Sequence, residues 1–223
     1  MQRAALLLAA AIVLAMAAPR LPAQQFDGVM QFVTYENDAD HPDTMTQMTK
    51  GSKIRMEGLG KGAAMIVDGT KRIIIMPSQK QYMEFPPSTG SKEEAKEAAK
   101  HHGVAVKTGK TETIAGIPCE DWHYKGTDDD GKPEEGDACL AKNAGFMIGR
   151  FAGDMQMKVF DAGGQAFNNA INTGSGLMKV TTNGKVVFTA VKAQATSLPD
   201  AMFAPPAGYT KLDMSQMGMP RKP

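Results

Sequence analysis

Residues 63–76 read AAMIVDGTKRIIIM, two short runs of apolar and β-branched residues separated by Asp68-Gly69. An Asp-Gly pair between two such runs is a strong hairpin signal, because both residues accept the positive φ of the tightest turns. Residues 177–182 and 185–193 flank Asn183-Gly184 and repeat the pattern near the other end of the chain. The two hairpins predict an antiparallel sheet.

Other short runs of strand-forming residues recur between these hairpins and on either side of them. They span residues 26–35, 45–50, 53–57, 80–85, 104–107, 110–114, 119–125 and 137–142. Two segments favour helix: residues 91–100 open with a capping-box pattern, and residues 151–171 carry apolar side chains at helical spacing around Gly163-Gly164. We therefore expect an α+β, mainly β fold, with a curved antiparallel sheet or incomplete β-barrel of about eleven strands covered by two helices.

The first 23 residues have the pattern of a secretory signal peptide. A basic start containing Arg3 precedes an uncharged apolar run over residues 4–18, and we place the cleavage site after Ala23. The apolar run is too short to span a bilayer comfortably, and no second one follows. The predicted organisation is a signal peptide over residues 1–23, a half-barrel domain over 24–198 and a partly irregular C-terminal tail over 199–223. The mature protein is expected to be soluble and exported, in the periplasm or outside the cell.

Export changes the interpretation of the two cysteines, Cys119 and Cys139. Oxidising compartments favour a disulfide over free thiols. The polar, Gly- and Pro-containing residues 128–136 lie between them and favour a hairpin turn. If the flanking segments pair, the two cysteines face each other across the strands at a separation that a disulfide tolerates.

Charge and motif content exclude several classes of function. The chain has 25 Lys+Arg against 24 Asp+Glu, a formal net charge of +1, so binding to nucleic acid has no electrostatic basis. Ser175 lies in Gly174-Ser175-Gly176, which lacks the spacing of a nucleophile elbow, and none of the four histidines belongs to a metalloprotease-type pair. We therefore expect neither an enzyme nor a cofactor.

Three stretches of the sequence resemble a bacterial exported family known only as domain of unknown function 4412. They are KIRME (53–57) with MIVD (65–68) and Tyr82-Met83, then IAGIPCE (114–120), then FAPPAGY (203–209). That family is similar to the periplasmic lipoprotein-carrier fold, an antiparallel half-barrel whose concave face can hold acyl chains. The resemblance implies a binding or carrier-like protein whose partner is a lipid or a lipoprotein acyl chain. On this hypothesis the residues expected to line the concave face are Met30, Phe32, Met65, Ile74 and Met83.

The 17 methionines leave a second hypothesis open. Met214, Met217 and Met219 resemble the thioether clusters that hold copper(I), because soft ligands select soft ions. A third hypothesis is a structural interaction module of the cell envelope, in which the sheet is filled and no ligand binds. In that case methionine serves as an adaptable filler of the core.

Overall fold

The computed structural model describes residues 26–35, 42–59, 62–69, 71–85, 103–127, 132–142, 144 and 164–213. These residues form one twelve-stranded sheet together with one α-helix and two short 3-10 helices. The strands are β1 (Gly28–Thr34), β2 (Asp43–Lys50), β3 (Lys53–Leu59), β4 (Ala63–Asp68), β5 (Lys71–Met76), β6 (Gln81–Phe85), β7 (Val104–Ile114), β8 (Ile117–Thr127), β9 (Pro133–Ala141), β10 (Gly176–Thr182), β11 (Lys185–Ala195) and β12 (Thr210–Lys211). The helices are η1 (Pro77–Gln79), α4 (Gly164–Asn172) and η2 (Asp200–Phe203).

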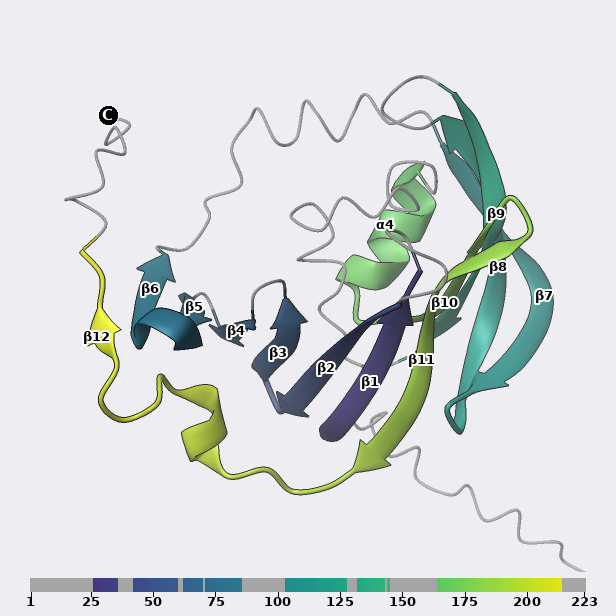
Figure 1. The fold of residues 1–223 in the computed structure, drawn as a ribbon. Helices are drawn as coiled ribbons and strands as arrows, with labels where there is room; N and C mark the ends of the chain where they lie inside the picture. The colour runs from purple at the N-terminus through teal and green to yellow at the C-terminus, as the bar shows by residue number, and fades with distance from the viewer. Residues whose placement is uncertain are drawn as a thin grey trace, which may run out of the picture.

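The sheet is open, and its strand order is β12-β6-β5-β4-β3-β2-β1-β11-β10-β9-β8-β7. Figure 1 shows the end made of β7–β10 curling round α4, while β3–β6 extend away from the helix as a wing. The prediction of a mainly β fold is confirmed, but the expectation of an entirely antiparallel sheet of about eleven strands is wrong. β12, from the segment expected as a tail, pairs parallel to β6.

Of the two predicted helices, the structure describes part of one. The segment 91–100 and the residues 151–163 lie outside the described residues, and α4 begins at Gly164. Gly164 has φ of +65°, and a Cβ there would lie 1.8 Å from the carbonyl oxygen of Gly103, so only glycine fits. Phe167 on α4 packs edge-on against Trp122 of β8, with ring centroids 6.2 Å apart. This contact, together with packing on β7, places α4 in the curled end of the sheet.

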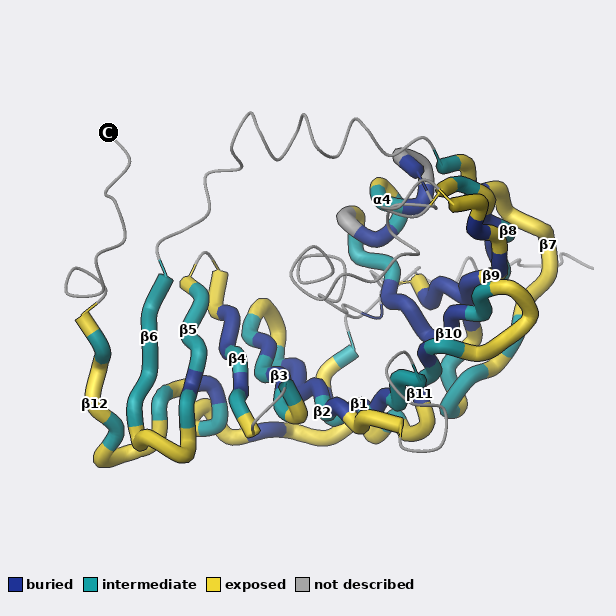
Figure 2. Tube along the Cα trace, turned by 45° about the horizontal axis from the view of Figure 1, so that its top comes forward, coloured by how far each residue is buried: buried dark blue, intermediate teal, exposed yellow. Residues whose placement is uncertain are grey.

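Apolar side chains fill both faces of the sheet. On the inner face, the large core joins residues such as Phe32 and Met56 to Phe167 and Phe188. On the outer face, a smaller core joins Met48, Ala64, Ile66 and Ile75 to Leu198 and Phe203 of the C-terminal segment. Figure 2 shows burial falling from β1 and β2 toward β6 and β12. The wing is therefore the less covered part of the sheet.

Cys119 and Cys139 form a disulfide between β8 and β9, with their Cα atoms 5.4 Å apart. The expected direct opposition is wrong, because Cys139 pairs in register with Asp121. The bridge is therefore diagonal, joining positions offset by two residues on one face. The two segments predicted at 104–107 and 110–114 also form a single strand, β7, whose register shifts between Lys107 and Thr111.

Candidate functional site

An unbroken row of apolar side chains crosses the inner face of the wing. Met56 of β3 pairs with Met65 of β4, Met65 pairs with Ile74 of β5, and Ile74 pairs with Met83 of β6. Residues directly opposite in antiparallel strands point to the same face, with their Cβ atoms about 5 Å apart. We call Met56, Met65, Ile74 and Met83 the inner row. Its length across three strand spacings is about 14 Å.

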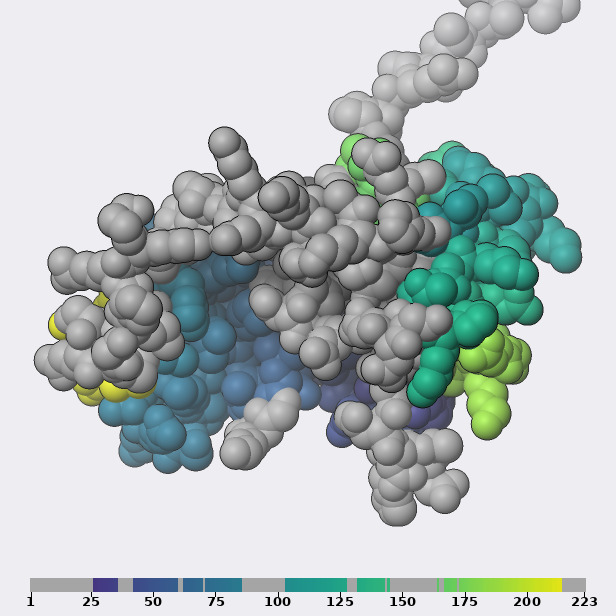
Figure 3. Space-filling view, turned by 90° about the horizontal axis from the view of Figure 1, so that it is seen from above, coloured from purple at the N-terminus to yellow at the C-terminus, as the bar shows by residue number. Residues whose placement is uncertain are grey.

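Burial changes along this row. Met56 is 1% exposed, whereas Met65, Ile74 and Met83 are half-buried. In the view from above, atoms of the blue strands of the wing form part of the molecular surface (Figure 3). Three of the residues predicted to line a concave surface, Met65, Ile74 and Met83, thus lie side by side where the inner face is incompletely covered.

The other two residues predicted for the concave surface lie elsewhere on the same face. Met30 and Phe32 of β1 are both 0% exposed. The ring of Phe32 stacks on Phe188 of β11 with a centroid separation of 5.1 Å. These two side chains belong to the filled core at the curled end and support the sheet from which the wing extends.

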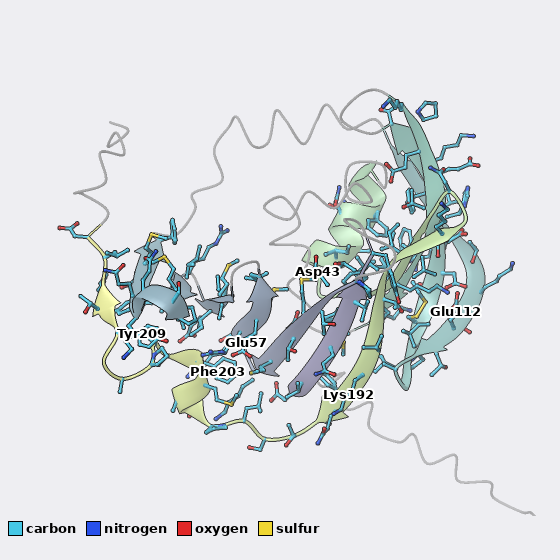
Figure 4. All side chains as sticks on the ribbon, viewed as in Figure 1. Asp43, Glu57, Glu112, Lys192, Phe203 and Tyr209 are labelled. Atoms are coloured by element: carbon cyan, nitrogen blue, oxygen red, sulfur yellow. A yellow bond between two sulfur atoms is a disulfide. The ribbon has the colours of Figure 1, made fainter. Side chains whose placement is uncertain are left out.

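The C-terminal segment closes the outer face of the wing. Phe203, in η2 against β3 and β4, is 6% exposed, and Tyr209 packs against the same outer core. Figure 4 shows both side chains on the side of the wing away from α4. The backbone nitrogen of Thr210 donates to the carbonyl oxygen of Lys80 at 3.0 Å, and that of Leu212 donates to Tyr82 at 2.8 Å. The wing is thereby backed on its outer side and held in a fixed shape.

Ion pairs hold this segment to the sheet. Asp200 lies 2.9 Å from the Nζ of Lys53 and 3.2 Å from that of Lys50, and these bonds lower the pKa of the Asp200 carboxyl. Lys211 bonds to Glu84, which lowers the pKa of the Glu84 carboxyl. All of these pairs lie on the outer face and leave the inner row free of them.

A small pocket of about 300 Å³ lies where the end of α4 meets β8 and β9. Its lining includes Trp122, Asn169, Ser175 and Lys107, whose Nζ lies 5.3 Å from the centroid of the Trp122 ring and 2.8 Å from Glu120. Lys107 is therefore held in place by a cation–π contact and an ion pair. This pocket is polar at its rim and is separate from the inner row.

A polar hollow of about 700 Å³ lies on the outer face of β7–β10, beside the disulfide. The ammonium of Lys179 bonds to both carboxylate oxygens of Glu112, labelled in Figure 4. Burial, with Glu112 as a further cause, raises the pKa of the Asp121 carboxyl. The hollow contains charges of both signs, so it has no single charge for which a ligand would be selected.

Sequence analysis missed two buried polar residues on the inner face. Gln47 and Thr49 of β2 are each 1% exposed, and Gln47 Nε2 donates to Thr49 Oγ1 at 3.2 Å. The alternation in β2 places Met45 on the same face as Gln47, but Met48 on the other. With methionine on both faces, the sequence alone could not tell which face is inner.

The predicted copper-binding residues Met214, Met217 and Met219 lie outside the described residues. In the described part of the chain, no three His, Cys, Asp or Glu side chains are placed to hold a metal ion. Among the same residues, no helix has the length and apolar character needed to cross a membrane.

A family model described as a domain of unknown function (DUF4412) matches residues 26–209, from before β1 to the end of the outer-face segment. The chain belongs to the DUF4412 family. No curated protein matches it. A crystal structure titled as an uncharacterized conserved protein from Thermus thermophilus is similar to this DUF4412 protein with a TM-score of 0.42 and 10% identity, covering 83% of this chain and 90% of that chain. The similarity to the lipoprotein-carrier fold stays a prediction.

Proposed function

We propose that this DUF4412 protein is an exported, non-enzymatic protein that binds the apolar chain of a lipid or lipoprotein on the inner face of its wing. The observation that carries the proposal is the inner row. It starts at a fully buried methionine and continues onto three adjacent strands where Met65, Ile74 and Met83 are only half-buried. A long acyl chain is narrow and apolar, which matches a row one side chain wide.

Two further features support this proposal. The outer face of the same strands is already closed by Leu198 and Phe203, so the inner face is the side that a ligand would complete. Three of the four side chains in the inner row are methionines, whose unbranched thioether chains re-pack readily around apolar ligands of varied shape. Flexible methionine surfaces are typical of proteins that accept more than one apolar partner.

The proposal is tested by binding of diphenylhexatriene, a neutral elongated hydrocarbon that fluoresces in apolar surroundings. The Ile74→Glu variant places a charge in the middle of the row, and burying that charge under the probe is strongly unfavourable. We expect its affinity to fall at least about tenfold, which is about 1.4 kcal/mol. The matched control is Val191→Glu, because Val191 is 50% exposed on β11, outside the row.

The control should bind the probe like the wild type. Equal affinities of Ile74→Glu and the wild type would contradict the proposal, as would a wild type that does not bind. Far-ultraviolet circular dichroism checks that both variants fold. The export part of the proposal predicts that protein recovered from its native host starts at Gln24, which intact-mass spectrometry tests.

A further inference from the structure

One polar side chain interrupts the apolar line to which the inner row belongs. Gln47 of β2 pairs in register with Met56 on one side and with Met30 on the other. The line therefore runs Met30, Gln47, Met56 and on to Met83 without leaving the inner face. Gln47 is 1% exposed, so its amide is removed from solvent.

The amide of Gln47 is only half satisfied. Its Nε2 donates to Thr49 Oγ1 at 3.2 Å, while its Oε1 has no hydrogen-bond partner. A buried acceptor without a donor is destabilising, and native proteins rarely keep one unless water or a ligand occupies the site. Methionine, the neighbour in register on both sides, has no N–H or O–H to donate. The missing donor must therefore come from something other than these neighbours.

The position of Gln47 relates this unpaired oxygen to the proposed ligand. Gln47 lies at the buried end of the row, one strand beyond Met56, and four strand spacings of about 19 Å separate it from Met83. That is the length of a long-chain acyl group. A chain lying over Met83, Ile74 and Met65 thus directs its inner end toward Gln47. The side chain between them is that of Met56, which has enough rotatable bonds to move aside.

We propose that Gln47 Oε1 accepts a hydrogen bond from a neutral O–H or N–H group at the inner end of the bound chain. This inference rests on the proposed function and narrows its ligand class to neutral amphiphiles such as long-chain alcohols, acylglycerols or acyl amides. An ionised fatty acid has only acceptor oxygens and leaves Gln47 unsatisfied. A site built to pair a ligand hydroxyl or N–H strongly disfavours an analogue that lacks it.

The experiment compares probes that differ only in the donor. Hexadecanol is paired with its methyl ether, and hexadecanamide with its N,N-dimethyl derivative, each measured by displacement of diphenylhexatriene. The variant is Gln47→Met, which replaces the amide with the side chain found on both sides of it in register. The control is Gln31→Met, because Gln31 is a half-buried glutamine on the other face of β1.

We expect the wild type and Gln31→Met to bind at least one donor probe about tenfold more tightly than its blocked partner. The pair that shows the preference tells a hydroxyl ligand from an amide ligand. Gln47→Met should bind both members of each pair equally, and retained binding of the ether shows that the variant is folded. Binding without any preference in the wild type, or a preference that survives in Gln47→Met, overturns the inference alone. Failure of all four probes to bind the wild type overturns the proposed function as well.

Discussion

Replacing Phe203 with alanine tests whether the C-terminal segment belongs to the core of the domain. Phe203 is 6% exposed and packs in the outer core with Ile66 and Ile75. A phenylalanine ring buries about 150 Å² or more, and at about 25 cal/mol per Å² this burial contributes about 4 kcal/mol. Because the segment lies at the surface and can partly collapse into the space left behind, we expect a loss of about 3 kcal/mol in the free energy of unfolding.

The assay is urea denaturation followed by the fluorescence of Trp122, the single tryptophan. Trp122 lies in the inner core, so a shift of its transition shows that the outer-face segment folds cooperatively with the rest of the sheet. The control, Val191→Ala, removes a side chain that is 50% exposed and should change stability by less than about 0.5 kcal/mol. A loss below about 1 kcal/mol for Phe203→Ala would refute the view that this segment is part of the core.

Three further predictions concern the disulfide and the titrating carboxyl groups. Replacing both Cys119 and Cys139 with alanine should lower the free energy of unfolding by roughly 3 kcal/mol for a separation of 20 residues, and an unchanged urea midpoint would contradict this. Asp121→Asn should stabilise the protein at pH 7 by less than about 1 kcal/mol, because the raised pKa of Asp121 means that the folded state disfavours its ionised form. That gain should vanish as the pH falls below the ordinary carboxyl value of 3.8, and a gain that persists in acid would show another cause. Acidification should also loosen the C-terminal segment, because the pKa of Asp200 is lowered by Lys53 and the stabilisation is lost as the pH falls from 3.8 through the folded value. Hydrogen exchange at residues 200–212 should then accelerate before the sheet opens, and uniform protection down to global unfolding would contradict the prediction.

Local turn chemistry made much of the sheet predictable. Asn183 and Gly184 both have positive φ, at 50° and 77°, which is what the Asn-Gly signal requires of a two-residue hairpin. The Cys119–Cys139 bridge was likewise predictable from compartment and spacing. Its diagonal register was not, because that register depends on where the pairing of β8 and β9 begins.

Features that depend on contacts between distant segments could not be predicted from the sequence. The pairing of Thr210 with Gln81 brings together residues far apart in the chain, and neither segment carries a local signal for it. Alternation placed Met30 and Met65 on one face, but their different depths follow from how the sheet curls round α4. Gln47 became a candidate only when its missing hydrogen-bond partner was visible.

Photo-crosslinking tests the binding of an apolar chain to the inner row most directly. A long-chain alcohol with a diazirine near its methyl end is irradiated with the purified protein, and the labelled residues are mapped by peptide mass spectrometry. The proposed function predicts adducts on Met65, Ile74 and Met83, which face inward. Adducts confined to Ile66 and Ile75, which belong to the outer core, or no adducts at all, would contradict it.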